Sequence, residues 1–336
     1  MRDGVRRLMA GLVLGCVAGA AAAVPLSAPQ LLAAEGANDA PAVAEKPDDV
    51  KTRAVADNGQ AHVLAYKFRT NDVVSYEVVH LMEITTTKDV TSETAANESR
   101  ADKHYRVVSV DRDGNAILEL MIDRVRMSAK FGNAEPVKFD SDKPNETPPQ
   151  FKHVEKSVGK PLARIKVSPS GQLISTVELL PELQEAQGES EASRNFLVVF
   201  PERPLRVGDS WKDEPNLQVR VTVGNTLTRN VEVMRRYELV SVDGNLATIR
   251  VRNSILTPVR EAAMRAQLIQ RSPEGVIVFD MEKGLLVSRT QTINKTEIGV
   301  FGDNSSMRAV SDRTEVLVPG KAVARKPGAA ADSSTR

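Results

Sequence analysis

A chain of 336 residues is long enough for one or two domains, and its 26% charged and 41% hydrophobic residues are ordinary for a soluble globular protein. Aromatic residues make up only 4% of the chain, which argues against stacking platforms for single-stranded nucleic acid. The net charge of +1 and the lack of a Lys/Arg run argue against a phosphate-binding surface. We therefore expect no nucleic acid partner.

The first 34 residues have the layout of an export signal. A basic start with Arg2, Arg6 and Arg7 is followed by an apolar, Ala-rich run over 8–24. Small residues then lead to Ala34, where a signal peptidase would cut. The apolar run is short and rich in Ala and Gly, which favours a cleaved signal peptide (1–34) over a membrane span.

Cys16 is the one cysteine of the chain and lies inside this segment, after Leu14-Gly15. Bacterial lipoproteins place a small residue before a cysteine that is then acylated, so one interpretation is a lipid anchor at Cys16. The alternative is that Cys16 is an ordinary member of the apolar run. If Cys16 is removed with the signal, the mature chain has no thiol for a disulfide, a metal or a nucleophile.

Two segments lack hydrophobic periodicity. Residues 35–60 are rich in Ala, Pro and charged side chains and predict a disordered linker, and 319–336 predict a disordered tail.

The body begins with strand signals. Val74, Tyr76 and Val78 alternate with polar residues, which predicts a strand with one apolar face. A polar stretch over 92–103 then leads to 105–116, where β-favouring residues flank an Asp-Gly-Asn turn, the signature of a β-hairpin.

Apolar side chains change phase after this first hairpin, which predicts a bulge near Asp123-Arg124. Several prolines over 132–160 predict a long loop or insertion. Pro169 and Gly171 then supply the turn of a second hairpin over 165–174. Pro181 to Val198 predicts a strongly acidic helix.

The second half repeats this order. Residues 217–223 alternate cleanly and predict a strand, and 237–247 repeat the Tyr-led Asp-Gly-Asn hairpin. A helix is predicted over 257–271, from the Thr-Pro cap to the next Ser-Pro. A further Gly hairpin follows over 276–287, and polar-alternating strands continue to Val318.

These elements predict an α+β fold in which β dominates. Two diverged copies of an antiparallel β-meander, 61–198 and 199–318, would form one curved sheet or two facing sheets with a few covering helices. The length and divergence of the copies indicate an old duplication.

Catalytic and metal motifs are weak. Gly208-Asp209-Ser210 matches the nucleophile motif of one esterase class, but that class needs a downstream histidine. Here the four histidines, His62, His80, His104 and His153, all precede it. We interpret the motif as a tight turn before a packed Trp211, and we expect no enzyme activity.

Asp111-Arg112-Asp113-Gly114-Asn115 resembles a calcium loop, but its glycine is fourth where the EF-hand pattern has it sixth, and the second copy of the hairpin drops one Asp. A hairpin turn is the better interpretation. The histidines have no ligand spacing, and no phosphate-binding Gly loop is present, so neither a metal nor another cofactor is expected.

Three sets of residues carry a family resemblance: Pro204-x-x-Val207-Gly208-Asp209-Ser210-Trp211, the paired Ser-Val-Asp-Gly-Asn hairpins, and Phe279-Asp280 with Gly284-x-Leu286. Together they resemble a family of secreted bacterial proteins of unknown function, over about 60–318. Because these are turn and core residues, the resemblance implies no activity.

The leading hypothesis is a non-catalytic, exported cell-envelope protein that binds a hydrophobic ligand such as a lipid on a concave apolar face. Its location would be periplasmic or extracellular, or at a membrane if Cys16 is acylated. The alternative is a structural or assembly protein that docks an envelope partner protein. The sequence leaves both open, and it identifies no catalytic or cofactor-binding residue.

Overall fold

The structure is a computed structural model that describes residues 59–180, 197–213, 217–223, 227–270 and 272–320. The predicted signal peptide with Cys16, almost all of the predicted linker and tail, and positions 181–196 of the predicted acidic helix lie outside the described residues. Residues 197 and 198 of that prediction are not helical. No helix of the described ranges is both long and apolar enough to cross a membrane.

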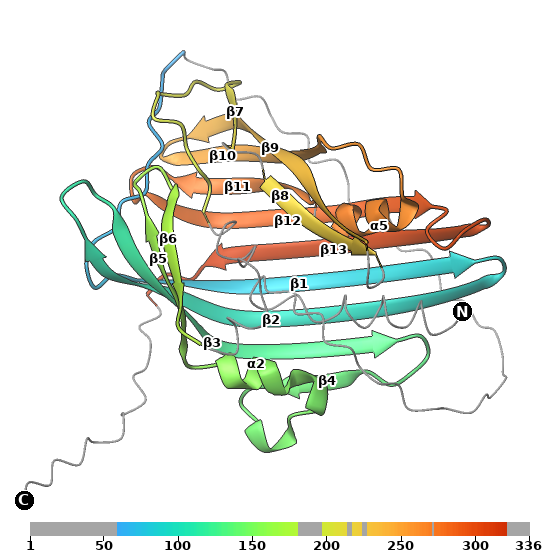
Figure 1. The fold of residues 1–336 in the computed structure, drawn as a ribbon. Coiled ribbons are helices and arrows are strands. Elements are labelled where there is room, and N and C mark those ends of the chain that lie inside the picture. The colour runs from blue at the N-terminus through green and yellow to red at the C-terminus, as the bar shows by residue number, and fades with distance from the viewer. Residues whose placement is uncertain (1–58, 181–196, 214–216, 224–226, 271, 321–336) are drawn as a thin grey trace, which may run out of the picture.

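One antiparallel sheet of 13 strands dominates the described chain, which confirms the β-dominant class (Figure 1). The strands of the first half are β1 (Val73–Lys88), β2 (Thr91–Val110), β3 (Ala116–Phe131), β4 (Val137–Asp140), β5 (Pro161–Val167) and β6 (Leu173–Glu178). Those of the second half are β7 (Ser210–Lys212), β8 (Leu217–Val223), β9 (Leu227–Asp243), β10 (Leu246–Ile255), β11 (Glu274–Asp280), β12 (Leu285–Ile298) and β13 (Ser305–Leu317).

The two halves join edge to edge into one sheet rather than two. The strand order is β6-β5-β3-β2-β1-β13-β12-β11-β10-β9-β7, with β4 added beside β3 and β8 beside β9. The junction is the long pairing of β1 with β13, which runs from Tyr76–Leu317 to Lys88–Ser305. Of the two arrangements left open by the sequence, the single curved sheet is therefore correct.

The predicted hairpins are confirmed, because local turn chemistry specifies them. Asp-Gly-Asn turns join β2 to β3 and β9 to β10, and Gly171 and Gly284 turn with φ of +84° and +64° between β5 and β6 and between β11 and β12. The register of β2 against β3 shifts opposite Asp123, where the bulge was expected.

Two predictions on element boundaries were wrong. The predicted loop at 132–160 contains β4, two short 3₁₀ turns (Pro144–Glu146 and Pro149–Phe151) and the helix α2 (Lys152–Ser157). Phe151 and Val154 of this segment pack on apolar residues of β3, so tertiary burial supports it despite its prolines. The second-half helix, α5 (Ala262–Gln270), begins after residues 257–261, which are not helical.

The entry segments of the two halves have matching backbone hydrogen bonds. Asn71 N donates to Val107 O, and Gly208 N donates to Leu239 O at the same place in the other half. In return, Val107 N donates to the carbonyl oxygen of Asp72, and Leu239 N donates to that of Asp209. This match is what a duplication predicts, although the common origin itself stays a prediction.

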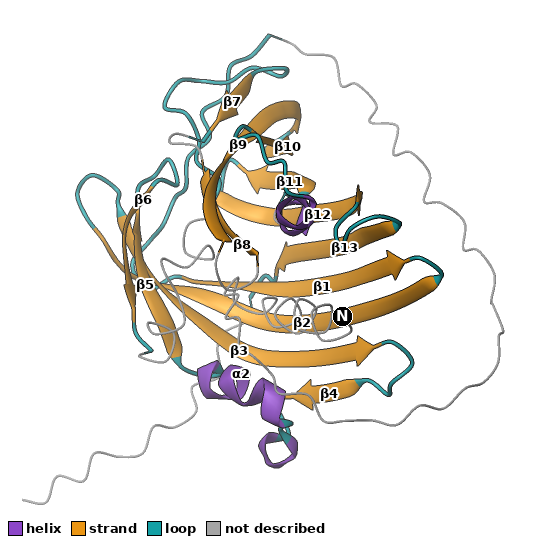
Figure 2. Ribbon diagram, turned by 45° about the vertical axis from the view of Figure 1, so that its right-hand side comes forward, coloured by secondary structure: helices purple, strands orange, loops and turns teal. Residues whose placement is uncertain are grey.

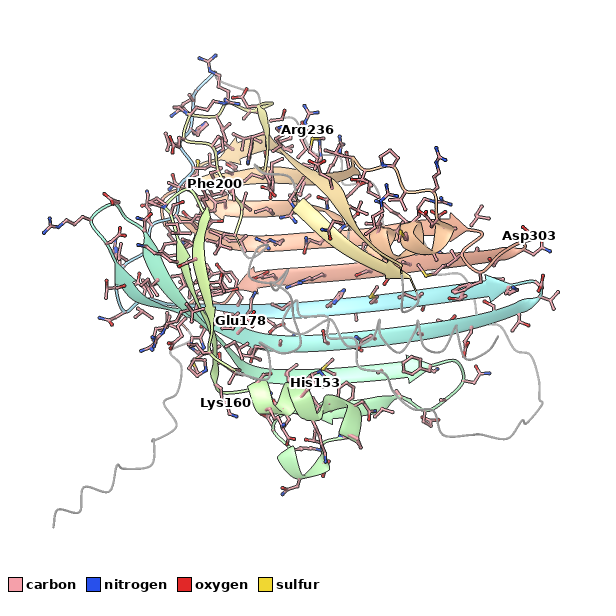
Figure 3. All side chains as sticks on the ribbon, in the orientation of Figure 1. His153, Lys160, Glu178, Phe200, Arg236 and Asp303 are labelled. Carbon is pink, nitrogen blue, oxygen red and sulfur yellow. The ribbon has the colours of Figure 1, made fainter. Side chains whose placement is uncertain are left out.

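Figure 2 shows the sheet curving around α5, and we call the face on which α5 lies the inner face. An aromatic core fills one end of this face, with Tyr66, Phe200, Tyr237 and Phe279 among its members. In Figure 3, the label Phe200 marks the end with the aromatic core. The label Asp303 marks the opposite end, at the turn between β12 and β13. The central part of the inner face lies between them.

Candidate functional site

The centre of the inner face carries a buried ion pair. Lys103 Nζ on β2 lies 2.7 Å from Glu315 Oε1 on β13, with side chains only 14% and 5% exposed. Lys103 Nζ also donates to the Tyr105 hydroxyl at 3.1 Å and lies over the Tyr105 ring, 5.2 Å from its centroid. The pair thus spans β1, which lies between the two strands.

Strand register brings further cations to this point. Arg289 of β12 is directly opposite Glu315, and Arg313 precedes Glu315 by two residues on the same face of β13. Because alternate residues of a strand share a face, all these side chains lie with Tyr76 and Tyr105 on the inner face. We call Lys103, Arg289, Arg313 and Glu315 the charged cluster.

The cluster shifts the pKa of its members. Burial alone would raise the pKa of Glu315, but Lys103, Arg289 and Arg313 together lower it to about 2. Burial lowers the pKa of Lys103, and Arg313 lowers it further, while Glu315 acts in the opposite direction. Because three cations surround it, the Glu315 carboxylate stays ionised at neutral pH.

Arg313 has no ion pair with a described residue, and its Nε is buried without a hydrogen-bond acceptor. Its cross-strand neighbours are His80 on β1 and Gln291 on β12, neither of which carries an acidic group. Buried polar atoms without partners are rare in native proteins and call for a physical explanation.

His80 extends the polar region along β1. Its Nε2 lies 2.8 Å from the Ser311 hydroxyl, while its Nδ1 is buried without a partner in the described ranges. Burial, with a smaller effect of Arg313, lowers the pKa of His80 to about 4, so the imidazole is neutral at pH 7. Ser99 on β2 is also buried on this face.

This polarity differs from the concave apolar face that was expected. The apolar residues of the inner face form clusters at its two ends and along β3, where α2 packs. Next to the charged cluster, a cavity of about 20 Å³ is lined by Tyr66, Tyr105, Leu286 and Glu315, among others. That volume holds roughly one water molecule, so an acyl chain does not fit there in this conformation.

The esterase-like motif forms a turn, as interpreted from the sequence. Gly208 has a φ of +91°, and Asp209 Oδ2 accepts hydrogen bonds from Arg206 N at 3.0 Å and Arg203 Nη1 at 2.9 Å. Ser210 accepts from Arg236 Nη2 at 3.0 Å, so neither side chain is positioned by a histidine.

The calcium-like loop is a hairpin turn. Asp111 Oδ1 accepts from Asn115 N at 2.9 Å and from Asp113 N at 3.1 Å, and its Oδ2 lies 3.2 Å from Lys166 Nζ. The Asp111 carboxylate is therefore occupied by donors of the protein itself. No group of three potential metal ligands occurs among the described residues.

One arrangement that the sequence did not reveal is a His–Asp pair on the other face. His104 Nδ1 lies 2.8 Å from Asp123 Oδ2, and Ser75 is directly opposite His104 in the β1–β2 register. These residue types match a base, an orienting acid and a nucleophile. However, Ser75 and His104 are only 6% and 3% exposed, so a substrate cannot reach them as they stand.

No protein-family model and no curated protein matches the chain. Among solved structures it is similar to lipovitellin, described for its lipid–protein interactions, at 11% identity and a TM-score of 0.39; the match covers 75% of this chain but only 25% of lipovitellin.

Two bacterial structures also show similarity. A domain assigned to outer membrane lipoprotein sorting, from Vibrio parahaemolyticus, matches at 9% identity, with 74% of this chain and 87% of that domain covered and a TM-score of 0.13. A DUF1329 family protein from Desulfovibrio piger gives 9% identity, 72% and 84% coverage and a TM-score of 0.13. These scores are too low to support an inference about function.

Proposed function

We propose that this chain is an exported, non-catalytic protein of the cell envelope that binds an amphipathic ligand, such as a lipid, on its inner face. The observation that carries this proposal is the order of side chains along the inner face of β1, where polar His80 is followed by half-buried Met82 and then by apolar Ile84. A ligand with a polar and an apolar end would match that order.

The apolar end of this surface is made by several strands. Ile84 belongs to a cluster with Ala95, Ile293 and Met307, against which Ala266 of α5 packs. At about 3.3 Å per residue, Ile84 lies roughly 13 Å from His80 along the strand. Ile84 is only 3% exposed, so a ligand that spans from His80 to Ile84 has an apolar portion at least that long and displaces α5 from this cluster.

The unpartnered polar groups at the polar end of this surface favour a bound ligand over a closed protein core. Arg313 Nε and His80 Nδ1 are both buried without partners in the described part of the chain. Leaving such groups unsatisfied costs about 1–3 kcal/mol each, and a bound polar head would remove that cost. Export rests on the signal-like segment with Arg2, Arg6 and Arg7.

Native mass spectrometry of the exported, gently purified protein tests this proposal. We expect an extra mass that organic extraction recovers as lipid. Met82→Asp places a charge on the inner face and should abolish the bound mass, whereas Leu81→Asp, on the outer face of the same strand, should retain it. Circular dichroism checks that both variants fold. A wild-type protein without bound mass, or equal loss in both variants, would contradict the proposal.

A second candidate is docking of an envelope partner protein, and the edge strand β6 favours it. β6 ends the sheet order, and its Ile174 and Val177 are 49% and 56% exposed. Exposed strand edges can pair with an extended segment of another protein. Copurification of a protein that is lost on Val177→Lys, with no lipid found, would favour this function instead.

A further inference from the structure

We propose that Arg313, with His80 and Gln291 beside it, recognises an oxyanion, so that the ligand of the inner face is an anionic amphiphile carrying a phosphate or carboxylate. This inference rests on the proposed function, because it assigns a chemical class to the head group of that ligand.

The first support is the position of Arg313 in the register. Its side chain stands on the inner face of β13 between His80 of β1 and Gln291 of β12. All three residues are half-buried, so their polar ends are partly shielded from water yet still reachable. A guanidinium in such a place binds phosphate or carboxylate in bidentate fashion, more strongly than it binds a neutral group.

The second support is that the charge of Arg313 is not neutralised by the described residues around it. On its own strand its same-face neighbours are Ser311 and Glu315, and its partners across β1 and β12 are the neutral His80 and Gln291. Glu315 is the one carboxylate among these, and it is already engaged with Lys103 at 2.7 Å. Lys103, Arg289 and Arg313 thus share one carboxylate, and the shielded excess of positive charge attracts an anion.

The third support is the order of the surrounding side chains. Ile293 lies two residues beyond Gln291 on β12, and Met82 lies two residues beyond His80 on β1, both on the side toward α5. An oxyanion bound at Arg313 therefore has Met82 and Ile293 on the side toward α5, whereas Arg289 and Glu315 of the charged cluster lie with Val78 on the opposite side. The geometry predicts a head at Arg313 and an alkyl chain directed over half-buried Met82 toward α5, which covers Ile84 and Ile293.

Isothermal titration of the exported, delipidated protein with matched probes tests this assignment. Dodecyl phosphate, dodecanoate and dodecanol share one alkyl chain and differ in charge, and inorganic phosphate has the charge without the chain. We expect both anionic amphiphiles to bind at least about 10-fold more tightly than dodecanol, the effect of a charge-assisted hydrogen bond. Arg313→Gln should reduce this preference to less than about 3-fold.

Arg308→Gln is the matched control, because Arg308 is an exposed arginine on the outer face of the same strand. It should keep the full preference for anionic probes. Equal affinity for dodecanol and dodecyl phosphate, or equal loss in both variants, would overturn the oxyanion assignment while leaving the proposed function intact. Failure of every alkyl probe to bind would instead overturn the proposed function. Tight binding of inorganic phosphate alone would keep the oxyanion site and reject the amphiphile.

Discussion

Glu315 links pH to stability, because it ionises in a buried place. Its pKa of about 2 in the folded protein lies below the ordinary 4.5, so the unfolded chain takes up this proton first as the pH falls. Glu315 therefore stabilises the fold fully above about pH 4.5, and this contribution is lost as the pH falls toward 2. In urea unfolding, we expect wild type to lose stability over this range more steeply than Glu315→Gln. Glu83→Gln, an exposed control on the outer face, should follow wild type.

At neutral pH the same substitution should be costly. Glu315→Gln leaves Lys103 buried beside two arginines without its counterion, which we expect to cost about 3–5 kcal/mol of unfolding free energy. Adding Lys103→Met removes the uncompensated charge and should restore most of the loss. A double variant no more stable than the single one would show that the pair is not the cause.

Substitutions at Gly171 and Gly208 allow the cost of backbone strain to be compared with the cost of steric overlap. Both have positive φ, +84° and +91°, but a Cβ at Gly171 would lie 2.2 Å from Val198 O and 2.7 Å from the Tyr66 ring, whereas at Gly208 it meets nothing within 4 Å. Gly208→Ala should cost roughly 1–2 kcal/mol for the left-handed conformation alone. Gly171→Ala should cost clearly more, measured by urea unfolding, and equal costs would contradict the packing around Tyr66.

At the scale of elements, local chemistry explains what the sequence could predict. The four hairpins that turn at Gly114, Gly171, Gly244 and Gly284 were predictable, because turn residues act within a few positions, whereas the β3–β4 hairpin at Gly132 lies in the predicted loop. The polar stretch 92–103 did not indicate a strand, yet it lies within β2, since Ser99 and Lys103 face a part of the inner face that is polar. Polarity on both faces removes the alternation on which strand prediction depends.

The charged cluster could not be predicted for a different reason. Lys103 and Glu315 come from opposite halves of the chain and meet only because β1 pairs with both β2 and β13. A signal was nevertheless present: Lys103 is in phase with Tyr105, and Arg313 and Glu315 are in phase with Leu317. Charged residues at core-facing positions indicate a functional or paired site when register is known.

α5 is predicted to stabilise the curvature, because it is buried on two sides. Met264 and Leu268 pack with Val231 and Val233 of β9, whereas Ala266 packs toward β12 and β13. Leu268→Ala should therefore cost about 2–5 kcal/mol, and the milder Ile269→Val at a partly buried position about 0.5–1.5 kcal/mol. Urea unfolding monitored by circular dichroism measures both, and a negligible effect of Leu268→Ala would show that the helix is not needed to hold β9.

At the scale of the whole molecule, the two halves should unfold together. They share one sheet through the β1–β13 pairing, and the aromatic core takes Tyr66 and Tyr105 from the first half and Phe200 and Phe279 from the second. Neither half can keep this core buried after the other has unfolded, so a single cooperative transition follows.

The one tryptophan of the chain makes this testable. Trp211 belongs to the second half, where it stacks on Tyr237 with ring centroids 5.3 Å apart, and its fluorescence reports that half alone. Far-ultraviolet circular dichroism reports the strands of both halves. We expect the two probes to give the same urea midpoint, and Tyr105→Ala, in the first half, to lower the Trp211 midpoint as much as the dichroism midpoint. Separate midpoints would mean that the halves are independent domains joined at β1 and β13, with the inner face divided between them.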